Sequence, residues 1–440
     1  MYAKPRPHPE GVSRNSSHPV RGAGITGVFF PGVRKKRVPL AKILAPLRGA
    51  LILLAPLRGA LIKVTELIFL IALLVIQMPS RDASISSALA ELNKGRVLES
   101  IEQFKEILRS DPANDRAHFY LSTLYTEMNE LEVAERYVRR AMDVNPGQGV
   151  HLHQLGLIRF RQKQWRPALM FFKQALEAGV GNNEAAVWRS IGDVQVELFD
   201  RDAALQAYET ALRIQPQDAR TRLALGRFYL ERSEPERAIP QLRAALEIDP
   251  MLRGAYPVLG RAYRQTGDLE SGMMILKKAL DIDPADQESR YALGQVLLAM
   301  GRVDEGRMEL EKYQRIDQQV STANDNYKTA LSHLTAHQFS EAEKLLREAV
   351  RLAPTYAPAL HSLGALLLDR GSPKNAADIL KRAVEANPLN AASWCSLGTA
   401  YFKLGKLPEA LEAAKRAVVL DEENGDYQRL LVEIQSKVTR

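Results

Sequence analysis

The chain has 440 residues, a formal net charge of +8 and 46% apolar residues, enough to bury a sizeable core. Its single cysteine, Cys395, excludes a disulfide framework, a zinc site built from cysteines and a lipid attached to a cysteine near the N-terminus. Residues 1–63 carry twelve Lys and Arg against Glu10 alone, a net charge of +11. The difference between +8 and +11 leaves −3 for the rest of the chain, which therefore shows no overall nucleic-acid footprint.

Residues 1–58 form a basic N-terminal tail that we expect to be disordered. Residues 1–38 are rich in Pro, Gly, Ser, Arg and Lys and show no apolar periodicity. Residues 45–54 are then nearly copied in residues 55–62. A copy this similar indicates a local duplication in a segment under weak constraint.

An apolar segment follows the tail. Residues 67–76 read LIFLIALLVI, and the stretch extends to 59–78, which is long enough to cross a bilayer. Lys63 within it can extend to the headgroups, but Glu66 counts against insertion. We expect a transmembrane anchor at 59–78 and a single-pass membrane protein. The basic residues before the segment favour the cytoplasm, so the remaining chain is expected on the extracytoplasmic side.

Two alternatives for this segment stay open. A cleaved signal peptide fits the length of the apolar run, but the region before the run is too long for one. The nearest pairs of small residues that could form a cleavage site, Ser84/Ser86 and Ser86/Ala88, lie inside the repeat pattern that begins at Arg81. The second alternative takes Met78 as the true start, so that residues 1–77 are not translated. That reading explains the duplication and leaves a cytoplasmic protein.

From Arg81 onwards a pattern of small residues returns with a period of about 34 residues. The clearest marker is a proline ladder, in which each step is one period or two periods plus two inserted residues: Pro112, Pro146, Pro216, Pro250, Pro284, Pro354 and Pro388. With each proline at position 32, ten repeats begin at residues 81, 115, 149, 185, 219, 253, 287, 323, 357 and 391. Positions 8 and 20 are then Gly, Ala or Ser in every repeat, and position 27 is Ala in eight.

Each repeat is predicted to fold as a hairpin of two amphipathic helices. Apolar residues recur at helical spacing in two stretches, for example Ile191 and Val194, then Tyr208 and Leu212. Positions 8 and 20 stay small where the two helices cross, and the proline ends the second helix. Because one hairpin cannot bury its apolar face alone, stacked hairpins must supply the core.

This pattern resembles the tetratricopeptide repeat (TPR) family, whose units have the same length and the same order of small residues and proline. Repeat 4 (185–218) carries the family's characteristic residues: Trp188, Gly192, Ala204, Tyr208, Ala211 and Pro216. The resemblance covers residues 81–424 as ten repeats and implies an all-α, right-handed α-solenoid of helix hairpins. Residues 425–440 lack the small residue of a further repeat, and we predict that they form a C-terminal capping helix.

Repeats 3 and 7 depart from the pattern. Val180 and Gln318 replace the proline, and Tyr313 replaces the alanine at position 27 of repeat 7. Two inserted residues follow each of these repeats. We expect these two joints to alter the superhelical angle or to act as hinges.

The sequence offers no convincing catalytic constellation. His333 and His337 have a spacing that can place two metal ligands on one helix face, but no acidic residue completes the set. His333 also occupies position 11, where other repeats carry a tyrosine that we expect to pack, so packing is the better interpretation. His151 and His153 point to different faces of a helix. We therefore expect no enzyme activity, no cofactor and no bound metal.

The resemblance implies that peptides bind on the concave surface, which positions 2, 5, 9, 12 and 13 of the first helices line in this family. These positions are charged in repeats 4 to 6, where arginines alternate with acids such as Glu231, and more apolar in repeats 8 to 10. The candidate groove residues are Arg189, Asp193, Arg220, Arg227, Arg261, Arg264, Tyr327, His361 and Phe402. The Lys/Asn clamp that chaperone-binding relatives use for a terminal carboxylate is not reproduced. Solvated surface arginines are the alternative interpretation.

These observations predict a non-catalytic scaffold that binds protein or peptide segments, of acidic character, in the concave TPR groove. The membrane would be contacted through residues 59–78, and no nucleic acid is expected as a partner. One alternative is a soluble cytoplasmic TPR adaptor with the same groove. Another is a regulatory subunit that holds an enzyme, for example one that builds envelope polymers.

Overall fold

The computed structural model describes residues 81–438, so the tail (1–58) and the apolar segment (59–78) lie outside the described residues. Every described element is an α-helix except one 3₁₀ turn, which confirms the all-α fold class. The elements up to α15 are α3 (Arg81–Asn93), α4 (Val97–Ser110), α5 (Asp115–Glu127), α6 (Leu131–Val144), α7 (Gly149–Arg161), α8 (Trp165–Ala178), η1 (Gly181–Asn183), α9 (Glu184–Glu197), α10 (Arg201–Ile214), α11 (Ala219–Glu231), α12 (Pro235–Ile248), α13 (Ala255–Thr266), α14 (Leu269–Ile282) and α15 (Gln287–Ala299). The remaining helices are α16 (Val303–Thr335), α17 (Phe339–Leu352), α18 (Ala357–Asp369), α19 (Pro373–Ala386), α20 (Ala391–Lys403), α21 (Leu407–Leu420) and α22 (Gly425–Val438).

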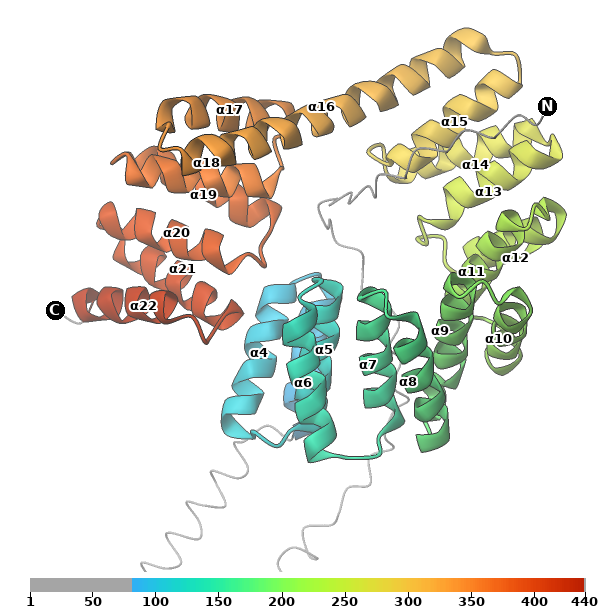
Figure 1. Ribbon diagram of the computed structural model, residues 1–440, viewed down its shortest axis with the longest axis horizontal. Helices are drawn as coiled ribbons and strands as arrows, with labels where there is room; N and C mark the ends of the chain where they lie inside the picture. The colour runs from blue at the N-terminus through green and yellow to red at the C-terminus, as the bar shows by residue number, and fades with distance from the viewer. Residues whose placement is uncertain (1–80, 439–440) are drawn as a thin grey trace, which may run out of the picture. The chain divides into compact units, whose positions relative to one another are not determined.

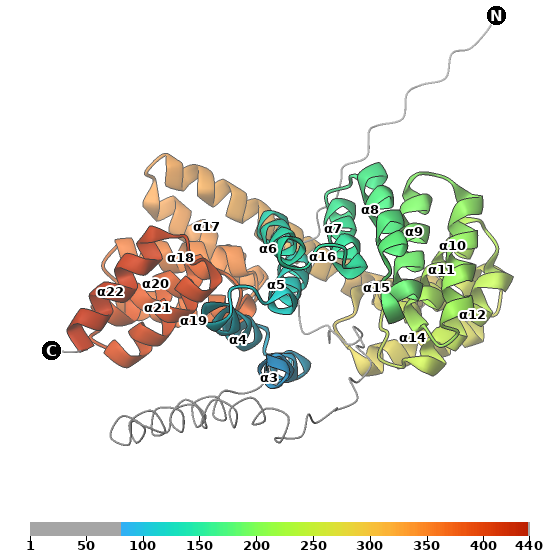
Figure 2. The ribbon, with the colours of Figure 1, turned by 90° about the horizontal axis from the view of Figure 1, so that it is seen from below.

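The described residues fall into two compact units, 81–314 and 315–438, and helices that follow each other in the chain pack as hairpins in both. In the first unit α5 packs on α6, α7 on α8, α9 on α10 and α11 on α12. In the second unit α18 packs on α19 and α20 on α21. Figure 1 shows these pairs, and Figure 2 shows the same pairs turned by 90°. The helix bounds follow the repeat period of the sequence.

The small residues lie where the two helices of a hairpin approach each other most closely. A Cβ atom added to Gly226, at position 8 of repeat 5, would come within 2.6 Å of Cγ of Leu242 in α12. In repeat 9, a Cβ on Gly364 would come within 2.4 Å of Leu380. Real Cβ atoms do not tolerate such distances, so the predicted reason for the small residues is confirmed.

Successive hairpins are joined through positions 3, 7 and 10 of the first helix in repeats 2 to 7, 9 and 10, where these positions are buried. In repeat 4 these positions are Val187, Ile191 and Val194, which are at most 5% exposed. They share one apolar cluster with Phe172 and Ala175 of the preceding second helix, α8. The first helix of a repeat is therefore buried largely by the repeat before it.

A hydrogen bond that crosses the repeat boundary recurs at the proline. The side chain at position 4 of one repeat donates to the carbonyl oxygen at position 32 of the repeat before it. The pairs are His118 to Pro112 (3.0 Å), Arg222 to Pro216 (2.8 Å), Tyr256 to Pro250 (2.9 Å), Arg290 to Pro284, Trp394 to Pro388 (2.7 Å) and, from the capping helix, Gln428 to Glu422 (2.6 Å). Each bond satisfies a backbone carbonyl at the turn between repeats.

A residue with left-handed backbone geometry joins the two helices of every hairpin. Position 15 has a φ between 55° and 85° in all ten repeats. Five of these residues are Gly95, Gly267, Gly301, Gly371 and Gly405, and the other five are Asn129, Lys163, Phe199, Ser233 and His337. Phe199 combines a φ of 61° with 85% exposure, so its side chain gains little packing to offset the strain of this geometry.

Replacing Phe199 by Gly is expected to raise the free energy of unfolding by about 1 kcal/mol, because glycine adopts this geometry without a Cβ clash. Urea denaturation of the full chain measures the change. Asn129→Gly is the matched control, and it should gain less because asparagine tolerates the left-handed region. A loss of stability in Phe199→Gly would contradict this account of the turn.

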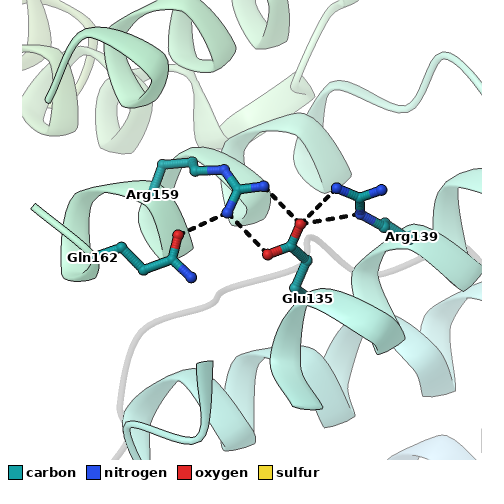
Figure 3. Close-up of polar contacts among 4 residues, drawn as sticks. All are labelled: Glu135, Arg139, Arg159 and Gln162. Atoms are coloured by element: carbon teal, nitrogen blue, oxygen red, sulfur yellow. Dashed lines mark hydrogen bonds and ion pairs between the residues drawn. The ribbon is translucent and has the colours of Figure 1, made fainter. Parts of the chain in front are cut away.

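A charged network crosses the boundary between repeats 2 and 3 (Figure 3). Glu135 of α6 accepts two hydrogen bonds from the guanidinium of Arg159 in α7, at 2.6 and 2.9 Å. Arg139 adds a bond of 2.6 Å to Glu135, and Arg159 also donates to Gln162 at 2.7 Å. The hydrogen bond from Arg159 is the main cause that holds the pKa of Glu135 below its usual value.

Glu135→Gln is expected to lower the free energy of unfolding by about 1–2 kcal/mol near neutral pH, because it removes charge-assisted bonds. The pKa of Glu135 is lower in the folded state, so its stabilisation is fully present above the unfolded-state value of about 4.3. It is lost as the pH falls through the folded-state pKa. Urea denaturation across pH should show the two proteins converge in acid.

The control for this prediction is Glu209→Gln, which makes the same change on the exposed surface of α10. It should shift the urea midpoint by no more than about 0.5 kcal/mol. A difference between Glu135→Gln and the wild type that does not shrink in acid would show that the charge of Glu135 is not what stabilises the joint.

Repeats 7 and 8 share one continuous helix, α16, of 33 residues (Figure 1). It combines the second helix of repeat 7 with the first helix of repeat 8, because Gln318 lets the helix continue where a proline would end it. Residues 314–322 in its middle are all exposed. The joint after repeat 3 is instead a turn that contains Gly179 and η1. Hinge motion at either joint stays a prediction.

The first helix of repeat 8 also lacks the apolar positions that bind a preceding repeat. Positions 3, 7 and 10 are Asp325, Thr329 and Ser332, and all three are exposed. Repeat 1 has the exposed residues Ala83, Ser87 and Ala90 at the same positions. Repeats 1 and 8 thus both leave positions 3, 7 and 10 exposed. The boundary between the two compact units lies just before repeat 8.

The expectation of a single-pass membrane protein is wrong for the part of the chain that the structure describes. Within residues 81–438, no helix combines the length and the apolar composition that crossing a bilayer requires. α16 is long enough, but charged residues occur along its whole length. Segment 59–78, the basis of the expected localisation, lies outside the described residues, so this localisation is withdrawn.

Candidate functional site

A pocket of about 180 Å³ lies between α11 and α13, the neighbouring first helices of repeats 5 and 6. It is lined by Arg227, Leu230, Glu231, Arg261 and Gln265. Arg227 and Arg261 both occupy position 9, whereas Glu231 and Gln265 both occupy position 13. By residue position the pocket therefore has a row of two arginines and, one helical turn further along, a row with one glutamate and one glutamine.

The charged residues of the pocket are available to a ligand. Arg227, Glu231 and Arg261 are all exposed, and none of them forms an ion pair with another described residue. The side chain of Arg227 extends towards Gly254, where an added Cβ atom would lie 3.1 Å from its Nη2. Unpaired charges of both signs thus face one small volume.

Arg189 is held by the fold. Its Nη1 lies 2.9 Å from Oδ2 of Asp218, and both side chains are mostly buried, with 21% and 13% exposed. Asp218 also caps α11, because it accepts from the backbone N–H of Arg220 at 3.1 Å and from the hydroxyl of Thr221. Arg189 therefore links repeat 4 to the start of α11, and Arg220 lies exposed at that start.

Asp193, at position 9 of repeat 4, is a partly buried carboxylate held by a tyrosine. The hydroxyl of Tyr208 donates to Oδ1 of Asp193 at 2.8 Å. Burial raises the pKa of Asp193, and the bond from Tyr208 and the charges of Arg189 and Arg227 oppose that rise. Burial also raises the pKa of Tyr208, which therefore stays protonated as a donor. Asp193 thus lies within electrostatic range of Arg227, on the repeat 4 side of the arginine row.

The remaining predicted groove residues do not line this pocket. Arg264 is exposed at position 12 of α13. In the second unit, the rings of Tyr327 and Tyr356 form an edge contact at 5.5 Å, and Nδ1 of His361 lies 3.2 Å from the hydroxyl of Ser393. Burial lowers the pKa of His361.

Phe402 packs against the cluster that contains Ile434 of α22. Tyr327, His361 and Phe402 are each partly covered by neighbouring helices, and they belong to a different unit from the arginines. Their role in a groove stays a prediction.

The histidines have structural partners. Nδ1 of His333 donates to Oε1 of Gln338 at 2.5 Å. His151 is 3% exposed, and Nε2 of His153 lies 3.0 Å from the hydroxyl of Ser190. Burial, with a smaller effect of Arg189, lowers the pKa of His153 to about 3. Within residues 81–438, no group of His, Cys, Asp and Glu side chains converges as a set of metal ligands.

Two of the pocket residues, Leu230 and Gln265, were missed by the sequence analysis. Both lie at positions that the family's groove rule includes, positions 12 and 13. Neither side chain is charged or aromatic, as the predicted groove residues are. Their positions in the repeat were the signal that would have found them.

Curated relatives match parts of the chain. The human cell division cycle protein 16 homolog is 28% identical over 114 residues, which cover 24% of this chain and 18% of that protein. Anaphase-promoting complex subunit 3 of Schizosaccharomyces pombe is 25% identical over 126 residues, 29% and 19% of the two chains. Tetratricopeptide repeat protein 8 of Caenorhabditis elegans is 26% identical over 144 residues, 33% and 28% of the two chains. The chain thus matches less than a third of the length of each relative.

Two solved structures match parts of the chain. PilW, a widely conserved type IV pilus biogenesis factor, is 15% identical with a TM-score of 0.43, over 50% of this chain and 99% of PilW. YrrB, a TPR protein with an unusual peptide-binding site, is 23% identical with a TM-score of 0.32, over 43% of this chain and 96% of YrrB.

The tetratricopeptide repeat family matches nearly all the described residues. The matched ranges are 86–148, 147–217, 196–256, 263–334, 327–384 and 361–427. Together they span the helix hairpins from α3 to α21. This chain belongs to the tetratricopeptide repeat family.

Proposed function

We propose that this chain is a non-catalytic adaptor that holds a segment of a partner protein against the first helices of its repeats. Proteins of the TPR family are protein-interaction scaffolds, which supports the general role. The observation that carries the specific proposal is the pocket between α11 and α13, where Arg227 and Arg261 face one volume without an ion-pair partner among the described residues.

The arginines indicate the chemistry of the partner. Two guanidinium groups that line one pocket suit a carboxylate, because each presents parallel N–H donors in a planar fork. An acidic side chain or a free C-terminal carboxylate of the partner would dock there. The pocket is open to water, so binding should weaken with salt, which screens exposed charges within about 10 Å at 0.1 M.

Several arginines of the first unit form ion pairs within the protein. Arg189 binds Asp218, Arg253 binds Asp283 at 2.6 Å, and Arg290 binds Glu309 at 2.9 Å. These arginines contribute contacts within the protein. Arg227 and Arg261 contribute none of this kind, although Glu231 lies one helical turn from Arg227.

Replacing Arg227 and Arg261 together by Ala is expected to weaken binding of a partner by about 1.5–3 kcal/mol, the range for hydrogen bonds to charged groups. The partner is first captured with the full chain from cell extract, purified and then titrated against the wild type and the double variant. Arg243→Ala, which removes an exposed arginine from α12 of the same repeat, is the matched control and should leave affinity unchanged.

Equal affinity of the wild type and the double variant would contradict the proposal. It would assign both arginines to the solvated surface.

A further inference from the structure

We infer that the pocket between α11 and α13 selects a peptide in which an acidic residue and a basic residue stand two positions apart. This inference rests on the proposed function, because it assumes that the pocket binds a peptide. It goes further in that it assigns Glu231 as a specificity-determining residue. The proposed ligand is an extended segment that carries both charges, as opposed to a run of acidic residues.

The pocket is lined by charged residues of both signs. Arg227 and Arg261 form the positive row, while Glu231 faces the same pocket as an exposed carboxylate with no ion-pair partner among the described residues. Opposite Glu231, Gln265 is neutral and does not balance it. A ligand that presents only carboxylates would satisfy one row and be repelled at the other.

The spacing of Arg227 and Glu231 along α11 matches that of side chains in an extended peptide. Arg227 and Glu231 are four residues apart on α11, which corresponds to about 6 Å along the helix axis. In an extended peptide, side chains two residues apart point to the same side and are about 6.6 Å apart. A peptide laid along α11 therefore places one side chain at the arginine row and the next on that side at Glu231.

Asp193 of α9 lies on the repeat 4 side of Arg227, and Glu231 lies one turn further along α11. Tyr208 donates to Asp193 through its hydroxyl, so Asp193 already has a partner within the protein. A long acidic tract that crossed the arginines would meet the exposed carboxylate of Glu231, so a single carboxylate next to a cation fits better.

Three labelled peptides with blocked ends and identical Gly-Ser flanks test the inference. Their centres are Asp-Gly-Lys, Asp-Gly-Gln and Asp-Gly-Asp, and each is titrated against the full chain by fluorescence anisotropy at low ionic strength. We expect the Asp-Gly-Lys peptide to bind most tightly, the Asp-Gly-Gln peptide less tightly and the Asp-Gly-Asp peptide least tightly. Each step should be about two- to fivefold, the range for an exposed ion pair.

Charge reversal at Glu231 supplies the decisive variant. Glu231→Lys should invert the order, so that the Asp-Gly-Asp peptide binds more tightly than the Asp-Gly-Lys peptide. Glu247→Lys reverses an exposed acid on α12 outside the pocket and should leave the order unchanged. Circular dichroism confirms that both variants keep the helical fold.

The outcomes separate this inference from the function on which it rests. If all three peptides bind equally, and binding is lost in the Arg227 and Arg261 double variant, the inference is overturned and the proposed function stands. If no peptide shows binding that depends on Arg227 and Arg261, both are overturned.

Discussion

The packing of each first helix against the preceding repeat is the interaction on which the rest of this structure depends. Positions 3, 7 and 10 supply the contact, as Val187, Ile191 and Val194 do in repeat 4. The close approach at position 8 makes the hairpin, but the hairpin cannot bury its apolar face without this second contact. Where the three positions turn polar, in repeat 8, one compact unit ends and another begins.

The same helices that are buried on one side build the candidate site on the other. On α11, Leu225 and Phe228 at positions 7 and 10 are buried in the core, while Arg227 and Glu231 at positions 9 and 13 face the pocket. Because α11 and α13 are neighbouring first helices of consecutive repeats, residues at the same repeat position lie at the same level on the two helices. The chemistry of the pocket therefore follows from which side chains occupy equivalent positions of repeats 5 and 6.

The repeat period of the sequence predicted the helices, their hairpin pairing and the reason for the small residues at positions 8 and 20. It did not predict the hydrogen bond to the carbonyl at position 32, because His118, Tyr256 and Trp394 are chemically different and share only the ability to donate. The ion pair of Arg189 was also missed, since its partner Asp218 belongs to the far end of the same repeat. Sequence spacing identifies faces of helices, and it does not identify which charges on a face find partners.

The fused helix α16 shows a different limit. The sequence pattern identified Gln318 and Tyr313 as departures from the repeat. It did not predict that these departures, together with the polar residues Asp325, Thr329 and Ser332, would produce one continuous helix. The lost proline permits a continuous helix, and the polar residues remove the contact that would have folded the chain back.

Hydrogen exchange along α16 tests the central claim that packing at positions 3, 7 and 10 holds each first helix. Residues 323–335, the first helix of repeat 8, lack this contact because Asp325, Thr329 and Ser332 are exposed, and a helix without such support is marginal in water. Their amides should therefore exchange much faster than those of α18, the first helix of repeat 9, whose Ala359, Leu363 and Leu366 are buried at the same positions. Equal protection of the two segments would contradict the claim.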